Sequence, residues 1–208
     1  MSDARIIPPA EARAIWRERW ARHDAPADRR PSAWVMAACA RLPAGALVAD
    51  LAGGDGRHAV PLARLGHRVA LVDFAERAVR LGVAAARDAE DAAAGTVSGV
   101  VADTAALPLR AGAFDAVVIV HFLERDLFPH LPALLRPGGL LIVETFTTAH
   151  LRLVAAGRAS GPRNPAYMLE PGELPRLAAP LRVDEYAEVE AMDGPASRAV
   201  ARLVATRA

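Results

Sequence analysis

A glycine-dense turn is the part of the sequence best suited to holding a ligand. Gly53, Gly54 and Gly56 follow the apolar run 46–51 and precede an amphipathic segment, 58–65. Because glycine lacks Cβ, the backbone can approach a ligand closely there and adopt positive φ angles. The helix behind the turn presents free N–H groups. The turn is therefore either a ligand cradle or an ordinary tight turn. By itself it does not identify the ligand, because residues 54–59 also satisfy a loose dinucleotide-binding pattern.

Three acidic residues lie at or near the ends of predicted strands. Asp50 precedes the glycines, Asp73 closes the next apolar run, and Asp103 closes the third. Asp73 lies 19 residues after Gly54, the spacing at which a carboxylate accepts hydrogen bonds from a ribose in related folds. The alternatives are a helix cap for Asp73 and a solvated turn residue for Asp103. Together the three acids predict a polar binding edge.

Two further residues with chemical potential follow the fourth predicted strand. The ordinary pKa of histidine is close to neutral, so His121 is a candidate general base or a residue of the pocket wall. Arg125 is a candidate ligand for an anionic substrate or a solvated loop charge. The six histidines and the carboxylates show no metal-ligand spacing, so no metal site is expected.

The elements that must position these residues alternate between strands and helices. Helices are predicted over 11–22, 32–41, 58–65, 75–94, 127–135 and 171–177. Strands are predicted over 46–51, 68–72, 96–102, 114–120, 140–146, 181–190 and 197–206, with a turn at 193–195 joining the last two. Such alternation indicates an α/β fold with a parallel sheet covered on both faces, ending in an antiparallel hairpin.

Composition narrows the class of protein. The chain has 208 residues, 53% of them hydrophobic, and a net charge of +1. The length fits one domain, and the near-neutral charge does not indicate a nucleic-acid partner. It contains no lysine, which excludes a Schiff-base lysine. Cys39 is the only cysteine, and the apolar runs are too short to span a membrane. We expect a cytoplasmic protein without a secretory signal.

In order and spacing, a series of motifs between residues 46 and 146 resembles the class I S-adenosylmethionine-dependent methyltransferases. These motifs are Asp50-Leu51-Ala52-Gly53-Gly54-Asp55-Gly56, Val72-Asp73, Ala102-Asp103 with Leu107-Pro108, Phe114-Asp115-Ala116-Val117 and Leu135-Arg136-Pro137-Gly138-Gly139-Leu140-Leu141. With Trp16, Arg19 and Trp20, the chain looks most similar to small bacterial enzymes of the tellurite-resistance and thiopurine methyltransferase type.

The resemblance implies a fold and an organisation. The fold is a Rossmann-like three-layer α/β sandwich whose seven-stranded, mostly parallel sheet has the order 3-2-1-4-5-7-6 and an antiparallel C-terminal strand. The single methyltransferase domain would comprise a helical lid (1–44), a cofactor-binding core (45–146) and a substrate-side loop, helix and hairpin (147–208).

The resemblance also implies residue roles. S-adenosyl-L-methionine, which leaves as S-adenosyl-L-homocysteine, would be bound by Asp50, Ala52, Gly53, Gly54, Gly56, Asp73, Phe74, Asp103, Thr104 and Val120. His121 would lie near the reacting methyl group. Trp16, Arg19, Arg125 and Tyr167 would contact the substrate. Ala52 departs from the family, which has glycine there; we expect alanine to be tolerated in an ordinary backbone conformation.

The expected activity is methyl transfer to an unidentified acceptor, preferably a small molecule, by a monomer or homodimer. Two alternatives stay open: an NAD(P)-dependent oxidoreductase on a Rossmann-type fold, and a non-catalytic protein that binds S-adenosylmethionine. The first lacks a catalytic lysine and room for a second domain.

Overall fold

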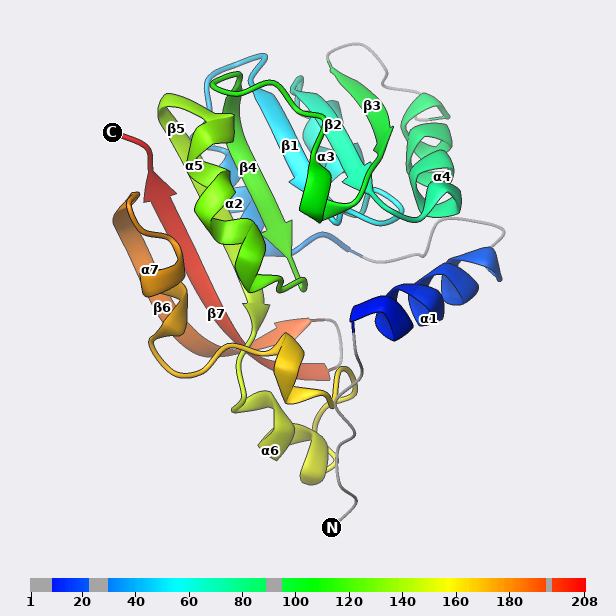
Figure 1. Cartoon of the computed structure of the whole chain (residues 1–208), viewed down its shortest axis with the longest axis vertical. Coiled ribbons are helices and arrows are strands. Elements are labelled where there is room, and N and C mark those ends of the chain that lie inside the picture. The colour runs from blue at the N-terminus through cyan, green and yellow to red at the C-terminus, as the bar shows by residue number, and fades with distance from the viewer. Residues whose placement is uncertain (1–8, 23–29, 89–94, 194–195) are drawn as a thin grey trace.

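The fold is built on a single seven-stranded sheet (Figure 1). The computed structural model describes residues 9–22, 30–88, 95–193 and 196–208. The strand order is β3-β2-β1-β4-β5-β7-β6, which confirms the predicted topology. The strands are β1 (Leu47–Leu51), β2 (Arg68–Asp73), β3 (Thr96–Val101), β4 (Phe114–Val120), β5 (Leu135–Phe146), β6 (Arg182–Asp193) and β7 (Ala196–Thr206).

The direction of the strands follows the prediction. The strands β1 to β5 pair in parallel, while β7 pairs antiparallel with both β5 and β6. Parallel strands place their carboxyl ends along one edge of the sheet, and ligands of open α/β sheets bind outside that edge. Asp50, Asp73, Asp103 and His121 all lie at or just beyond these ends.

Helices cover both faces of the sheet (Figure 1). The α-helices are α1 (Pro9–Ala21), α2 (Ala33–Cys39), α3 (Ala59–Arg64), α4 (Glu76–Arg87), α5 (Leu131–Leu134), α6 (His150–Ala155) and α7 (Glu173–Leu177). Three 3-10 helices are η1 (Thr104–Ala106), η2 (Arg125–His130) and η3 (Pro165–Tyr167). Ser32 caps α2, as predicted, by accepting a hydrogen bond from the Val35 N–H at 3.4 Å. None of the helices in the described ranges is long and apolar enough to cross a lipid bilayer.

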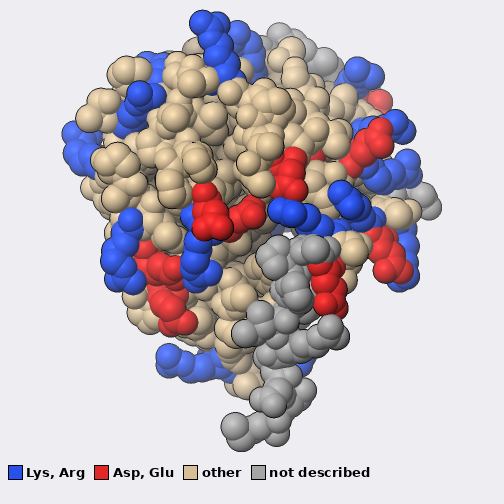
Figure 2. All heavy atoms as spheres, in the orientation of Figure 1, with Lys and Arg blue, Asp and Glu red and all other residues tan. Residues whose placement is uncertain are grey.

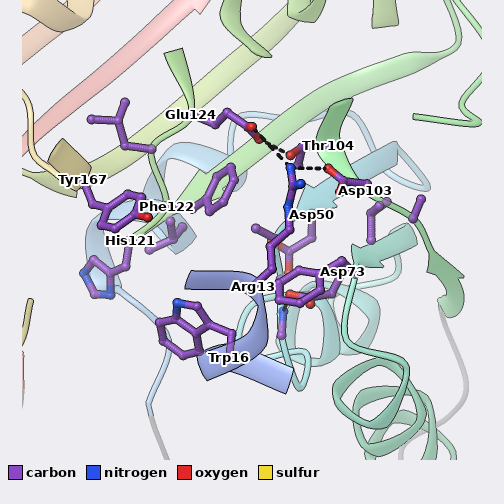
Figure 3. A pocket seen from close by; sticks show the side chains of 18 of the residues that line it. Arg13, Trp16, Asp50, Asp73, Asp103, Thr104, His121, Phe122, Glu124 and Tyr167 are labelled. Atoms are coloured by element: carbon purple, nitrogen blue, oxygen red, sulfur yellow. Dashed lines mark hydrogen bonds and ion pairs between the residues drawn. The ribbon is translucent and has the colours of Figure 1, made fainter. Parts of the chain in front are cut away.

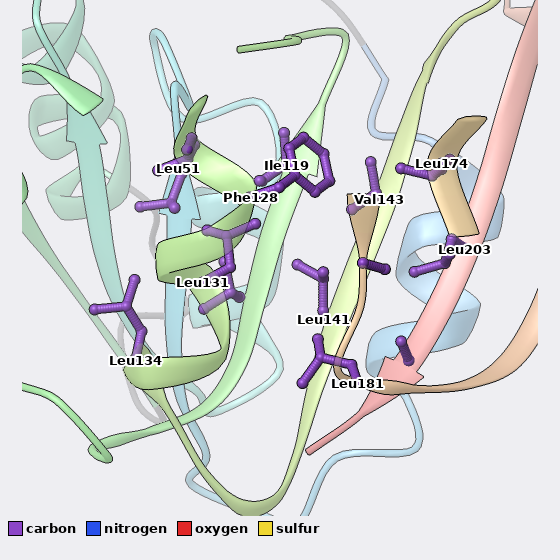
Figure 4. Packing of buried hydrophobic residues seen from close by; sticks show 14 of the residues in the cluster. Leu51, Ile119, Phe128, Leu131, Leu134, Leu141, Val143, Leu174, Leu181 and Leu203 are labelled. Carbon is purple, nitrogen blue, oxygen red and sulfur yellow. The ribbon is translucent and has the colours of Figure 1, made fainter. Parts of the chain in front are cut away.

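Two buried apolar clusters fill the spaces between the sheet and the helices on its two faces. One joins η2, α5 and α7 to one sheet face through residues such as Phe128, Leu131 and Leu174 (Figure 4). The other packs Val35 and Leu62, from α2 and α3, against the opposite face. Burying this much apolar surface is the main favourable contribution to folding, and it fixes the strand ends that carry the polar site.

Some element boundaries differ from those predicted. The strand β5 begins at Leu135, not Leu140, because the end of β7 supplies partners. The Gly138 N–H donates to the Arg207 carbonyl at 2.8 Å, and the Arg207 N–H donates to the Gly139 carbonyl at 2.9 Å. The helix α6 lies in a segment predicted as loop. The helix predicted over 75–94 ends at Arg87; residues 89–94, and 194–195 of the predicted hairpin turn, lie outside the described residues.

Candidate active site

A pocket of about 600 Å³ lies outside the carboxyl ends of β1, β2, β3 and β4 (Figure 3). This volume falls in the range of roughly 300–1,000 Å³ that small-molecule sites occupy. Most of the predicted site residues line it: Trp16, Asp50, Ala52, Gly53, Gly54, Asp73, Phe74, Asp103, Thr104, Val120, His121, Arg125 and Tyr167. Gly56 and Arg19 do not.

The lining has two sides of different character (Figure 3). The glycine-turn side consists of Asp50, Gly53, Gly54, Asp73 and Phe74. The aromatic side consists of Trp16, His121, Phe122 and Tyr167. Acidic side chains and backbone therefore face ring systems across the pocket.

Two buried carboxylates define the glycine-turn side. Asp73 accepts hydrogen bonds from the Gly54 and Ala75 N–H groups, both at 2.9 Å. Asp50 accepts one from the Ala59 N–H at 3.1 Å. Burial raises the pKa of Asp50 to about 7, the Ala59 hydrogen bond lowers it, and the charge of Asp73 raises it. Burial likewise raises the pKa of Asp73. A cationic ligand would favour the charged form of both acids.

The glycine turn is closely packed. A Cβ atom at Gly53 would lie 2.5 Å from Leu71 Cδ1 and 2.7 Å from Asp50 Oδ2, and one at Gly54 would lie 2.9 Å from the Trp20 ring. Gly56 has a φ of +80°, and its Cβ would lie 3.3 Å from Gly82 Cα. Gly56 therefore allows the turn and the close packing of α4, outside the pocket lining.

The backbone conformation expected for Ala52 was wrong. Its φ is +53°, in the left-handed region, where a side chain costs about 1–2 kcal/mol. The turn between β1 and α3 requires this conformation, which glycine would adopt without that cost. Ala52 nevertheless lines the pocket.

An ion-pair network spans the pocket between α1 and two loops (Figure 3). Arg13 Nη2 donates to Asp103 Oδ1 at 3.1 Å and lies 3.8 Å from Glu124 Oε1. The Thr104 hydroxyl donates to Glu124, and Asp103 also caps η1 by accepting from the Ala105 N–H at 3.0 Å. Sequence reasoning missed Arg13 and Glu124, because their roles depend on α1 folding back onto the loops.

The helix α1 also supplies aromatic side chains to the pocket. Trp20 is buried against Ala75 and Ala78, beside Phe74. Trp16 is 45% exposed, and the Arg19 guanidinium lies 4.8 Å from its ring centre. Arg19 thus contacts a lining residue instead of the pocket itself.

His121 is held in an unusual conformation. Its φ is +56°, and a non-glycine residue in this region marks local strain, which clusters at functional sites. Its ring stacks on Phe146 with centres 4.7 Å apart. Its Nδ1 lies 3.4 Å from Arg57 Nη1, and its Nε2 lies 4.0 Å from Glu144 Oε1.

Arg125 lines the pocket, but its guanidinium is engaged with protein groups. It donates to both Glu173 oxygens, at 2.6 and 2.9 Å, and to the Ala166 and Met168 carbonyls. The hydrogen bond to Glu173 raises the pKa of Arg125, and the same bond lowers the pKa of Glu173. These contacts fasten η3, and with it Tyr167, over the pocket.

The described residues contain no group of three or more histidine, cysteine or acidic side chains that could hold a metal ion. The pocket lining offers carboxylates, backbone amides, aromatic rings and two histidines, His58 and His121, for binding and positioning a ligand.

Residues 48–139 match the family model described as a methyltransferase domain. This span contains the glycine turn, all three acids and His121. Residues 48–139 therefore form a methyltransferase domain. The fold of the chain is that of solved S-adenosylmethionine-dependent methyltransferases.

Solved structures share this fold. A SAM-dependent methyltransferase from Methanosarcina mazei is 20% identical, with a TM-score of 0.67, covering 82% of this chain and 96% of that one. Geranyl diphosphate C-methyltransferase from Streptomyces coelicolor A3(2), solved with S-adenosyl-L-homocysteine, is 18% identical, with a TM-score of 0.63, covering 85% and 77%.

TehB from Haemophilus influenzae is also similar, with 18% identity and a TM-score of 0.64, covering 84% of this chain and 61% of that one. No curated protein matches the sequence. The family match favours a methyltransferase over the oxidoreductase alternative, and the low identities to solved structures leave the acceptor to be argued from the site.

Proposed function

We propose that this methyltransferase acts on a small-molecule acceptor that binds beside the cofactor in the same pocket. The observation that carries this proposal is the covering of the pocket. Trp16 from α1 and Tyr167 from η3 line it together with the strand-end residues, so the acceptor subsite is bounded by side chains from three separate segments. A covered pocket suits a small acceptor better than a duplex or a folded protein.

The surface charge supports the same preference. On the face shown in Figure 2, acidic side chains are interspersed with arginines. The net charge is +1. Nucleic-acid-binding proteins instead gather basic side chains into a patch or stripe.

On this proposal, the glycine-turn side holds the cofactor. The carboxylate of Asp73 would accept the ribose hydroxyls, with the Phe74 ring beside the adenine. Asp103 and the Thr104 backbone would contact the adenine edge. Asp50 and the backbone of Ala52, Gly53 and Gly54 would lie along the methionine part. The fit is supported by the closely packed turn, where a Cβ at Gly53 would collide with Asp50.

The aromatic side would then hold the acceptor, between Trp16, Phe122 and Tyr167, with Val120 and His121 nearest the methyl group. Arg125 would act by fastening η3 to Glu173. When bound, S-adenosylmethionine supplies an electrophilic methyl group on a good leaving group. The protein's own residues orient the acceptor in line with it and keep water out.

The segment organisation follows from these roles. Residues 1–44 would act as a lid through α1 and Arg13, 45–146 as the cofactor-binding core, and 147–208 as the substrate side. If α1 acts as a lid, binding of S-adenosylmethionine should slow the exchange of backbone amide hydrogens in this helix. Monomer and homodimer are both compatible with this arrangement.

The test is a release assay for S-adenosyl-L-homocysteine with a panel of thiols, phenols, amines and carboxylates, and with DNA, RNA and unfolded protein. We expect turnover with at least one small acceptor and a large loss in Trp16→Ala. Asp184→Ala, on the β6 surface, serves as the control. Turnover with a macromolecule alone would contradict the proposal.

A further inference from the structure

Glu144 is a buried carboxylate in the middle of an apolar strand. It lies in the β5 run Leu140–Phe146 and is 4% exposed. Its neighbour on β4 is Val120, which lines the pocket. A buried charge costs free energy unless it is paired, and an apolar side chain would serve the fold at least as well. The fold alone therefore does not account for Glu144.

The contacts of Glu144 connect it to the pocket. Its Oε2 accepts a hydrogen bond from Arg202 Nε at 2.7 Å, and its Oε1 lies 4.0 Å from His121 Nε2. Its backbone carbonyl accepts from the His121 N–H at 2.8 Å. Glu144 thus holds the His121 backbone by a hydrogen bond and places a carboxylate oxygen near one of its ring nitrogens.

The positive charges around His121 disfavour protonation of its ring. A charged imidazolium there therefore needs the nearby Glu144 carboxylate. Arg57 faces Nδ1 at 3.4 Å, and Arg198 lies behind Phe146, 5.6 Å from its ring centre. Arg202, on β7, donates a hydrogen bond to the Glu144 carboxylate and brings a third positive charge near the ring. All three arginines oppose a positive charge on the ring, and Glu144 is the acidic group facing it at close range.

We infer that Glu144 is a positioning residue that makes His121 a general base, and that the acceptor therefore carries a proton on its nucleophilic atom. This inference rests on the proposed function. It selects thiols, hydroxyls and N–H groups over thioethers and other proton-free nucleophiles. Holding a base in one orientation through a carboxylate on its second nitrogen is a general device of catalytic histidines.

In the methyl-transfer step, Arg57 Nη1 gives up its contact with His121 Nδ1, 3.4 Å away, and the acceptor proton passes to this nitrogen. The electron pair of the acceptor atom forms the bond to the methyl carbon. The pair of the broken carbon–sulfur bond remains on sulfur, which gives S-adenosyl-L-homocysteine. Glu144 stabilises the imidazolium until the proton leaves to solvent.

The test does not need the acceptor. The ring signals of His121 are followed by NMR against pH in the protein saturated with S-adenosyl-L-homocysteine, with assignment by His121→Gln. In Glu144→Gln the midpoint of this titration should move to lower pH by about 1–3 units, because a carboxylate near an imidazolium favours the charged form by that amount. Glu190→Gln, which removes a surface acid paired with Arg158, should leave it unchanged.

A second variant guards against misfolding of the first. Arg202→Gln removes the cation that shares Glu144, so the His121 midpoint should move to higher pH. An unchanged midpoint in either folded variant, or an equal change in Glu190→Gln, overturns the inference. Failure of the unaltered protein to bind S-adenosyl-L-homocysteine would instead overturn the proposed function.

Discussion

On the glycine-turn side of the pocket, carboxylates are held by backbone amides, whereas the elements around the aromatic side are held by other side chains. Asp50 and Asp73 accept from N–H groups of the chain that follows their own strands or of the neighbouring turn. Arg13 and Arg125 instead pair with acids from distant segments. The first arrangement is built into the sheet; the second depends on where loops and α1 lie.

This difference explains what the family match covers. The matched span, 48–139, contains the whole glycine-turn side, while Trp16 and Tyr167 lie outside it. The proposed cofactor side therefore lies inside the matched domain, whereas two of the residues proposed to contact the acceptor lie outside it.

The largest expected effect concerns the free-energy cost of burying a charged carboxylate on the glycine-turn side of the pocket. The pKa of Asp50 is raised from 3.8 to about 7, so the folded protein holds this proton to higher pH than the unfolded chain. Its contribution to stability is fully present below about pH 4 and is lost as pH rises to about 7, by at most about 4 kcal/mol. Between pH 5 and pH 8, the free energy of unfolding measured with denaturant should decline less in Asp50→Asn than in the unaltered protein.

Asp50→Asn separates the contributions of the two buried carboxylates. Because the pKa of Asp73 is also raised, part of the decline in unfolding free energy should persist in this variant. An identical pH profile in the variant and the unaltered protein would contradict the assignment of the penalty to Asp50.

The second prediction concerns Asp73→Ala. Removing the carboxylate leaves the Gly54 and Ala75 N–H groups without their acceptor and removes the proposed ribose contact. The affinity for S-adenosylmethionine should fall about 5- to 150-fold, which corresponds to roughly 1–3 kcal/mol. Calorimetry measures it, with Asp184→Ala as the control. Equal affinity in the two variants would reject the ribose role.

The third prediction concerns the aromatic side alone. Arg125→Ala and Glu173→Ala, combined in a double-mutant cycle, should show a coupling of about 1 kcal/mol in unfolding free energy, since the Arg125 side chain is 39% exposed. Affinity for S-adenosylmethionine should stay within about twofold, because the pair is separate from the glycine turn. A large loss of cofactor affinity would break the distinction between the two sides.

The smallest effect is expected at Ala52. Glycine relieves the left-handed strain of about 1–2 kcal/mol but increases the entropy of the unfolded chain by about 0.4–1 kcal/mol. Ala52→Gly should therefore raise the free energy of unfolding by between zero and about 1.6 kcal/mol. Ala49→Gly, in the regular strand β1, should lower it. Destabilisation by Ala52→Gly would show that the methyl group of Ala52 makes contacts that outweigh the strain.

Sequence reasoning succeeded where the signal is local. Alternating apolar runs predicted the mostly parallel sheet, and the family resemblance implied its strand order. The spacing of Gly54 and Asp73 placed both residues on the pocket. The hydrogen bond between these two residues follows from the strand ends being neighbours.

It failed where a residue's role depends on distant partners. The pairing of Arg13 with Asp103 joins residues 90 positions apart, and no periodicity in α1 predicts it. Glu144 lies in a run that indicates a buried strand, so its pairing with Arg202 depends on the antiparallel register of β5 and β7. The positive φ of Ala52 depends on the shape of the turn, and an alanine in the sequence gives no indication of it.

Titration calorimetry of the unaltered chain with S-adenosylmethionine, and separately with NAD, tests the central claim most directly. The account predicts saturable binding of S-adenosylmethionine at one site per chain, weakened in Asp73→Ala, and no saturable heat with NAD. Saturable binding of NAD with none of S-adenosylmethionine would contradict it.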